Sequence, residues 1–347
     1  MHQEDIPMLF DYCVSNPPYQ MDKTTAVNNS ADNIFHLFYQ YGIDFTHQVI
    51  MIFPGGRWMQ RSSRGNKAAH VIYPTVNTID WYPNGDEKNI TKVFSGIRIP
   101  DGVCIVTGSS NAVTDSDILL NGIHFERPDD QGILPLTCWM SRVAYRILQQ
   151  YDDRAVHHKQ PVTLFDVPTY YSEKNPDKAC ILEDTASKNM MDDPIVAYIA
   201  NSNRGTSKRV DPHWLESSAV DWDDKRLDAF HTYKVCVAQA GAGKDPANTS
   251  YYSIDKDTVI GNSWVVVGMF DTKQEADNYR NYVDTKTVRA LLNESKGGKS
   301  KKWGYFVPYL EDYTSRNPHI DWDKPLDPQL YKLFNLTNEE INTIENS

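Results

Sequence analysis

The sequence has no long hydrophobic segment, no charged-then-apolar leader and few cysteines. No run approaches the ~18 apolar residues that a helix needs to cross a bilayer, and the N-terminus has no signal-peptide pattern. The cysteines are odd in number, widely spaced and without a CxxC pair: Cys13, Cys104, Cys138, Cys180 and Cys236. We therefore expect free thiols, no metal site and a cytoplasmic protein without membrane contact.

Length and hydrophobic pattern predict two domains. The chain has 347 residues, of which 40% are hydrophobic, enough for two sizeable cores. Strand-like segments at 7–14, 48–54, near 70–82 and 93–107 predict an α/β domain over residues 1–130. The remainder, 131–347, alternates short strand-like runs with turns and contains a helical segment at 272–293 that starts with a Thr272–Glu275 capping box. A further short helix is expected to open at 335–340.

One helix of the first domain is predicted over residues 31–42, with Ser30 as its cap. Its apolar residues recur at helical spacing, and we expect them to face the core: Ile34, Leu37, Phe38 and Tyr41.

The most informative motif is Asn16-Pro17-Pro18-Tyr19, which follows the strand-like segment 10–14. The two prolines fix the backbone and leave the carbonyl groups unused by a helix or a β-ladder. Two acceptors, the Asn16 amide oxygen and the Pro17 carbonyl, can then take both hydrogens of an exocyclic amine while the Tyr19 ring stacks on the base. This arrangement suits a flipped base, although a rigid turn after a strand fits the same residues.

At these four residues the chain resembles the N6-adenine DNA methyltransferases of bacterial restriction-modification systems, whose catalytic loop reads Asp/Asn/Ser-Pro-Pro-aromatic. Segments 48–58 and 93–106 resemble the family's next strand and later hairpin, in gamma-type order. Segments between 233 and 340 resemble the target-recognition half of large fused restriction–methylation enzymes. The resemblance implies a partial Rossmann-like methyltransferase sheet over 1–130, followed by an irregular β-rich α+β target-recognition domain over 131–347.

The resemblance also implies the chemistry: methyl transfer from S-adenosylmethionine to adenine N6 in double-stranded DNA. Asn16, Pro17, Pro18 and Tyr19 form the implied catalytic loop, and Tyr19 stacks on the extruded base. Phe94 is a candidate for stacking on the opposite face, and packing at a strand edge is the alternative for it.

A cofactor loop of the family's type is not found. An aromatic-x-Gly-x-Gly turn should lie well upstream of Asn16, and a half-site of this kind needs several tens of residues. The glycine-containing segment 240–244 suggests a permuted motif order or a P-loop, but Ala238 and Asp245 break the Walker pattern, so we expect a hairpin turn there. The cofactor-binding residues stay unassigned. We expect a second methyltransferase or restriction subunit that carries the cofactor half-site and meets the N-terminal strand edge and the 31–42 helix.

The formal net charge of −11 is unfavourable for DNA binding, so the placement of basic residues decides this question. One basic stretch spans 286–302 and another follows the strand at 48–53. The first also fits a solvated, flexible loop, because it contains Gly297 and Gly298. Together with the resemblance, the two stretches predict phosphate contacts from Arg57, Arg61, Arg64, Lys296, Lys299, Lys301 and Lys302.

Other classes of function fit less well. A non-catalytic, methyltransferase-derived protein that binds DNA or inhibits restriction enzymes agrees with the acidic charge, whereas the intact Asn16–Tyr19 loop favours catalysis. A hydrolase has little support, because no serine lies in a GxSxG turn. Acidic pairs such as Asp152-Asp153 fit a solvated surface better than nuclease chemistry.

Overall fold

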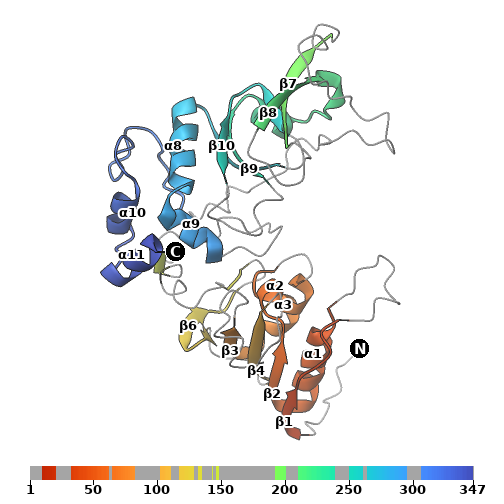
Figure 1. The fold of residues 1–347 in the computed structure, drawn as a ribbon. Helices are drawn as coiled ribbons and strands as arrows, with labels where there is room; N and C mark the ends of the chain where they lie inside the picture. Colours follow the sequence, from red (N-terminus) through yellow and green to blue (C-terminus); the bar gives the residue numbers. More distant parts are fainter. Residues whose placement is uncertain are drawn as a thin grey trace. The chain divides into compact units, whose positions relative to one another are not determined.

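The computed structural model divides the chain into two compact units (Figure 1). Unit 1 comprises Met1–Tyr145 with Glu294–Ser300, and unit 2 comprises Arg146–Asn293 with Lys301–Ser347. The division thus follows Tyr145 rather than residue 130, and the functions assigned to the two domains stay predictions. The structure describes residues 10–20, 33–61, 65–82, 102–110, 117–128, 132–134, 143, 146–147, 192–200, 210–238, 250–260, 264–294 and 306–346.

Unit 1 is built on a six-stranded mixed sheet with strand order β1-β2-β4-β3-β5-β6. Its strands are β1 Phe10–Ser15, β2 Thr46–Phe53, β3 Val76–Tyr82, β4 Val103–Ser109, β5 Asp117–Leu120 and β6 Ile123–Glu126. β1 and β2 are parallel, whereas β4 runs antiparallel to both β2 and β3. β3 pairs in parallel with β5, and β5 forms an antiparallel hairpin with β6. This confirms the α/β class and the strand expected at 48–54, and the described part of the segment expected at 7–14 forms β1.

Three helices pack on one face of this sheet: α1 Phe35–Phe45, α2 Gly56–Met59 and α3 Asn66–Ile72. The facing residues of β2, Val49, Met51 and Phe53, are at most 1% exposed. Alternate residues of the same strand, Ile50 and Ile52, are only half-buried. Since successive residues of a strand point to opposite faces, the core of unit 1 lies on the helix-covered face.

The predicted orientation of α1 is wrong. The helix buries Phe35, His36, Tyr39, Gly42 and Ile43, whereas Leu37, Phe38 and Tyr41 are 52%, 41% and 68% exposed. Apolar residues occur around most of this helix, so their spacing alone does not define its buried face.

Gly42 explains the observed orientation of α1. A Cβ atom at this position would lie 2.8 Å from Cγ2 of Val49, so the helix approaches β2 through its glycine. The helix begins at Phe35, with Ile34 at the N-cap position, rather than after Ser30 as expected.

The strand expected near 70–82 is also partly wrong, because its first residues belong to α3. Residues Ala68, Ala69 and Ile72 are buried, at the three- and four-residue spacing of a helix. The backbone N–H of Tyr73 still donates to the carbonyl of Ala69, and β3 begins only at Val76.

Unit 2 contains two three-stranded sheets, in agreement with the expected β-rich α+β character. The first has the order β10-β9-β12 and is antiparallel, with β9 Tyr233–Ala238, β10 Tyr251–Ile254 and β12 Trp264–Phe270. The second has the order β11-β7-β8, with β7 Pro194–Ala200, β8 Val210–Glu216 and β11 Thr258–Ile260. A 3-10 helix η4, Ser217–Ala219, and helix α7, Asp224–Phe230, lead from β8 to β9.

The helical segment expected at 272–293 forms two helices, α8 Lys273–Val283 and α9 Lys286–Glu294. The predicted capping box is confirmed, because Thr272 and Glu275 each accept from the other's backbone N–H. The break follows from Thr285, whose buried hydroxyl oxygen accepts from the N–H of Val288 and so caps a second helix.

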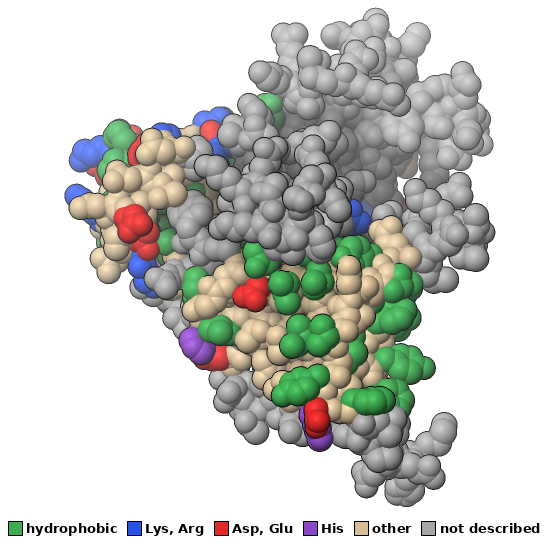
Figure 2. All heavy atoms as spheres, turned by 60° about the horizontal axis from the view of Figure 1, so that its bottom comes forward, with side chains coloured by type: hydrophobic (Ala, Val, Ile, Leu, Met, Phe, Trp, Pro, Cys, Tyr) green, Lys and Arg blue, Asp and Glu red, His purple; other side chains and the backbone are tan. Residues whose placement is uncertain are grey.

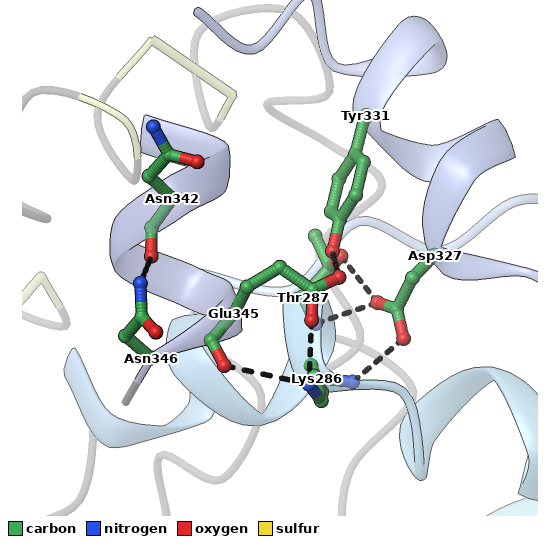
Figure 3. Close-up of polar contacts among 7 residues, drawn as sticks. All are labelled: Lys286, Thr287, Asp327, Tyr331, Asn342, Glu345 and Asn346. Atoms are coloured by element: carbon green, nitrogen blue, oxygen red, sulfur yellow. Dashed lines mark hydrogen bonds and ion pairs between the residues drawn. The ribbon is translucent and has the colours of Figure 1, made fainter. Parts of the chain in front are cut away.

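The C-terminal helices α10, Asp327–Leu333, and α11, Asn338–Glu345, are joined to α9 by polar contacts (Figure 3). The Asp327 carboxylate accepts from the backbone N–H groups of Lys286 and Thr287 at 3.2 and 2.9 Å. Glu345 accepts from Lys286 Nζ at 2.5 Å and from the Tyr331 hydroxyl at 2.6 Å. An anionic group at a helix N-terminus is favourable, so Asp327 stabilises the start of α9.

Some expected features lie outside the described residues. These are most of the hairpin at 93–107 and the glycine-containing segment at 240–244. Within the described part of the chain, no helix is both long enough and apolar enough to cross a membrane.

Candidate functional site

The loop after β1 is anchored at both ends. Ser15 pairs with Met51 of β2, and the backbone N–H of Ile34 donates to the Tyr19 carbonyl at 3.1 Å. An antiparallel bridge between Gln20 and Asn33 follows. The loop Asn16–Tyr19 is therefore held between the end of a strand and the start of α1.

Within this loop the side chains alternate between anchoring and exposure. Asn16 and Pro18 are exposed, Pro17 is buried, and Tyr19 is half-buried against the core of unit 1. The Tyr19 hydroxyl donates to Asn16 Oδ1 at 3.0 Å. An amide oxygen has two lone pairs, so Asn16 is oriented by Tyr19 and can still accept a second hydrogen bond.

Topology brings several chain segments to the edge of the sheet where this loop lies. β1 and β2 are parallel, so the loop after Ser15 and the turn after Phe53 leave the sheet at the same edge. β4 begins there, with Cys104 paired to Phe53, and β3 ends there, with Tyr82 paired to Val103. Ligands of open α/β sheets bind outside the carboxyl ends of such strands.

The turn after β2 is packed tightly by Trp81. A Cβ atom on Gly55 would lie 2.5 Å from the Trp81 ring, and one on Gly102 would lie 2.3 Å from it. Gly102 also has a φ of +64°, which favours glycine. The glycines of this edge therefore admit the Trp81 side chain, and Gly55 is not an open phosphate-binding turn.

Burial sets the ionisation of the neighbouring groups. Burial, and then the nearby Cys104 thiol, raise the pKa of Tyr19, which keeps its hydroxyl a donor to Asn16. Burial raises the pKa of Cys104 far above its ordinary value, and its Sγ donates to the Phe53 carbonyl at 3.2 Å. Cys104 is thus a protonated packing group rather than a nucleophile.

His36 lies in the first turn of α1, just after the loop. It is 8% exposed, and no hydrogen-bond partner is found for its Nδ1 within the described structure. Burial, and then the Lys67 charge, lower its pKa. A neutral imidazole is therefore favoured beside the loop.

The predicted site residues fall into three groups. Asn16, Pro17, Pro18 and Tyr19 come together in one loop, and Arg57 lies in α2, directly after the turn at the same sheet edge. Arg61 is 9% exposed; its Nε donates to the Gly132 carbonyl at 2.7 Å, and its guanidinium lies 5.0 Å from the Tyr73 ring centroid. This burial favours a packing role over the expected phosphate contact. The remaining predicted residues lie outside the described part of the chain: Arg64, Phe94, Lys296, Lys299, Lys301 and Lys302.

Two further members of the basic stretch at 286–302 have acidic partners. Lys286 pairs with Glu345, and Arg289 pairs with Asp284. Their charges are thus largely balanced within unit 2.

Sequence reasoning missed His36, Cys104 and Trp81 at this edge. His36 and Cys104 stand alone in apolar segments and carry no motif. Trp81 is accompanied by two glycines in the sequence, Gly55 and Gly102. A Cβ atom at either glycine would collide with the Trp81 ring, so both positions leave room for it.

The arrangement offers hydrogen-bond acceptors and an aromatic ring rather than a nucleophile or metal site. Among the described residues, no group of three or more His, Cys, Asp or Glu side chains could hold a metal ion. The exposed Asn16 amide and the adjacent Tyr19 ring can bind a planar group that bears an amine.

The N-terminal part of the chain is similar to a family of restriction-modification proteins. Residues 2–74 match the model of the family described as Eco57I restriction-modification methylase. The match covers β1, the Asn16–Tyr19 loop and the chain through α3. No curated protein matches the sequence.

Two solved structures show a distant likeness. The Type IIL restriction-modification enzyme MmeI, determined in complex with DNA, is 8% identical, with 95% of this chain and 50% of that chain covered and a TM-score of 0.34. The type IIG restriction endonuclease BpuSI is 10% identical, with 91% and 45% covered and a TM-score of 0.27. The chain spans about half the length of each of these two enzymes.

Proposed function

We propose that this chain is the catalytic and target-recognition portion of an N6-adenine DNA methyltransferase of a restriction-modification system. The observation that carries the proposal is the match of residues 2–74 to a restriction-modification methylase family. The matched segment includes a loop whose exposed Asn16 amide lies at the carboxyl edge of the sheet, hydrogen-bonded to Tyr19.

In this mechanism Asn16 Oδ1 and the Pro17 carbonyl accept the two hydrogens of the adenine amino group. Both acceptors hold the amine so that its nitrogen lone pair points at the incoming methyl carbon. The Tyr19 ring stacks on the extruded base, and stacking on an aromatic side chain contributes about 1–3 kcal/mol per base. Alignment of the reacting atoms then supplies much of the lowering of the barrier.

S-adenosylmethionine supplies the methyl group when it is bound. Asn16 and Pro17 would hold the amine that accepts this methyl group, and the surplus amine proton would leave to water. Gly55, in the turn after the parallel strand β2, is packed against Trp81, so this turn does not fit the cofactor. We therefore assign the cofactor half-site to a partner segment.

DNA contacts are assigned to basic residues of two stretches of the sequence, one after the strand at 48–53 and one within 286–302. The proposed set is Arg57, Arg64, Lys296, Lys299, Lys301 and Lys302. When such residues neutralise phosphates, the affinity for DNA falls steeply as the salt concentration rises. This salt dependence tests the DNA contacts separately from methyl transfer.

The test is methyl transfer from tritium-labelled S-adenosylmethionine to adenine-containing duplex DNA. The chain is assayed alone and with a purified cofactor-binding half of an Eco57I-family methylase. We expect transfer with the half-domain present and a loss of at least a hundredfold for Asn16→Ala. Asn77→Ala, at an exposed asparagine of β3, is the matched control and should retain transfer.

Duplex binding, measured by fluorescence anisotropy, separates this function from a binding role. Asn16→Ala should bind DNA about as well as the wild-type chain and fail only in transfer. DNA binding without transfer in every combination would favour the non-catalytic, methyltransferase-derived DNA-binding protein instead. Transfer by the chain alone would place the cofactor site within it.

A further inference from the structure

The first turn of α1 lies at the same edge of the sheet as the Asn16–Tyr19 loop. β1 and β2 are parallel and α1 connects them, so the helix of this βαβ unit begins at the carboxyl end of β1. The backbone N–H of Ile34 donates to the Tyr19 carbonyl at 3.1 Å, which holds the start of α1 beside the loop. A helix N-terminus in this position can bind an anion.

The rest of β1 and α1 offers little to an anion. Neither element contains a lysine or an arginine. Figure 2 shows hydrophobic side chains along the side of unit 1 that carries the two elements. Their exposed large hydrophobic residues are Phe10, Tyr12, Val14, Leu37, Phe38 and Tyr41. An anion beside the loop must therefore be held by the start of α1 or by a neighbouring element.

The start of α1 is not neutralised by its own first turn. The N-cap residue, Ile34, makes no side-chain hydrogen bond, and the first turn contains no acidic residue. The aspartate of this helix, Asp44, follows Phe35 by nine residues, which is about 14 Å along the helix axis. The positive end of the helix dipole is thus not balanced within α1.

A buried histidine lies at this helix start. His36 is 8% exposed, and its Nδ1 has no hydrogen-bond partner among the described residues. Helical side chains lean toward the N-terminus of their own helix, so the His36 ring is directed to the uncapped turn. An unpaired buried polar atom is costly, and a ligand oxygen at the helix start removes this cost.

Lys67, in the first turn of α3, adds a positive charge near the same ring. α1 and α3 pack against each other. Burial, and then the Lys67 charge, lower the pKa of His36. Lys67 itself is exposed, so its ammonium group can reach a ligand at the surface. An anion held by both side chains takes a hydrogen bond from the imidazole and a charge-assisted one from the ammonium group.

We propose that the start of α1 binds a phosphate group of the DNA strand that carries the extruded nucleotide, through its first backbone N–H groups, His36 and Lys67. This inference rests on the proposed function. A base stacked on Tyr19 is joined to its phosphates through a single sugar, and the start of α1 is hydrogen-bonded to Tyr19. Phosphate contacts fix the register of a protein on DNA, so this contact positions the nucleotide whose amine Asn16 accepts.

The probe for this site is 2′-deoxyadenosine 3′,5′-bisphosphate, which carries adenine with both neighbouring phosphates and needs no target sequence. The full chain is labelled with nitrogen-15 in its 10 histidines, and NMR follows the imidazole resonances. The variant His36→Phe identifies the resonance of His36. We expect the bisphosphate to shift the His36 Nδ1 resonance and deoxyadenosine to leave it in place. An unchanged His36 resonance on addition of the bisphosphate overturns the proposal.

Variants of the two side chains test their part in binding by NMR titration. We expect His36→Phe, which keeps a buried ring, and Lys67→Gln each to weaken bisphosphate binding at least fivefold and to leave deoxyadenosine binding unchanged. The matched control is His47→Phe, at an exposed histidine in the opposite end of β2, which should bind like the wild-type chain. Circular dichroism confirms that each variant is folded. Equal bisphosphate affinities of the wild-type chain, His36→Phe and Lys67→Gln contradict the assignment.

Inorganic phosphate separates a DNA-phosphate site from a general anion site. We expect it to shift the His36 resonance only at concentrations at least tenfold higher than the bisphosphate requires, because it lacks the base that Tyr19 holds. Equal affinities for the two probes would identify a site for free phosphate and overturn the assignment to DNA.

This inference and the proposed function fail in distinguishable ways. A His36 resonance that responds to the bisphosphate, with no methyl transfer in any combination, keeps the phosphate site and refutes the proposed function. Methyl transfer by His36→Phe and Lys67→Gln with the wild-type kcat and KM for DNA keeps the function and refutes the phosphate site.

Discussion

Tyr19 has two separate contacts in the free chain, one through its ring and one through its hydroxyl. The ring packs against the core of unit 1, whereas the hydroxyl donates to the exposed Asn16 amide. The first contact stabilises the fold, and the second orients the acceptor. Two substitutions at one position can therefore separate the role of the hydroxyl from that of the ring.

Tyr19→Phe should leave the free energy of unfolding within about 1 kcal/mol of the wild-type value, because one exposed hydrogen bond contributes little. It should also retain methyl transfer, since the stacking ring remains. Tyr19→Ala should lose both stability and transfer, the latter by the roughly 1–3 kcal/mol of base stacking. Urea unfolding and the tritium assay check the pair, and a large loss of transfer for Tyr19→Phe would show that transfer depends on the hydrogen bond to Asn16 more than on the ring.

Lys234 is the other residue whose environment has a measurable consequence. It is 0% exposed, and its Nζ donates to the carbonyls of Ala229, Phe230 and Thr232 at 2.8, 3.2 and 2.7 Å. Burial lowers its pKa to about 8, although Cys236 and two nearby carboxylates act in the opposite direction. The folded protein then binds fewer protons than the unfolded chain between pH 8 and about 10.5, the ordinary lysine value.

We expect the stability contribution of Lys234 to rise with pH across this window, because stability increases wherever the unfolded state binds more protons. The difference in unfolding free energy between the wild-type chain and Lys234→Met should grow by up to about 3 kcal/mol. Urea titrations from pH 7.5 to 10 measure it, with Lys225→Met, at an exposed position of α7, as the baseline. A difference that falls with pH would show that the three carbonyls hold the ammonium more strongly than burial opposes it.

At the scale of elements, the turns that enter and leave the strands of unit 1 depend on glycines in different ways. Gly102 and Gly122 both have positive φ, +64° and +79°. A Cβ on Gly102 would collide with Trp81, whereas one on Gly122 would meet nothing within 4 Å. The two positions thus form a matched pair for separating backbone strain from packing.

Gly122→Ala should destabilise unit 1 by about 1–2 kcal/mol, the cost of a left-handed conformation for a residue with a Cβ. Gly102→Ala should cost a further 1–3 kcal/mol or so, because the extra methyl group forces Trp81 out of its position. Equal urea midpoints for the two variants would show that the Trp81 ring moves without cost. Because Gly102 opens β4 beside the Asn16 loop, its variant should also lower methyl transfer more than Gly122→Ala does.

Elements with local signals could be predicted from the sequence. The Thr272–Glu275 box, the strands near 10–15 and 46–53, and the Asn16–Tyr19 loop each depend on neighbouring residues. The buried face of α1 could not be predicted, because it depends on Gly42 meeting Val49. The burial of Arg61 likewise depends on Gly132, 71 residues away, which a basic cluster in the sequence cannot indicate.

At the scale of the whole molecule, acidic side chains join helices of unit 2 through hydrogen bonds and ion pairs. Hydrogen bonds from Lys286 of α9 and Tyr331 of α10 to Glu345 hold α11 against these two helices (Figure 3). The same bonds lower the pKa of Glu345. The Thr314 side chain lowers the pKa of Asp312, and Lys324 lowers that of Asp321. These carboxylates lie in the C-terminal part of the chain, so we expect low pH to destabilise this part.

Each of these groups has a folded pKa below its ordinary value, so its stabilising effect is complete above about pH 4.5 and is lost as pH falls through the folded value. We expect the protection factors of the α11 amides to fall between pH 5 and 3, after correction for intrinsic exchange, which itself slows as pH falls. Glu345→Gln should show accelerated exchange already at pH 6, because its side chain no longer pairs with the Lys286 charge. Glu339→Gln, at an exposed position of the same helix, should behave like the wild-type chain. Equal protection of α11 in both variants would mean that apolar contacts, such as the burial of Ile344 at 1% exposure, hold the helix without the ion pair.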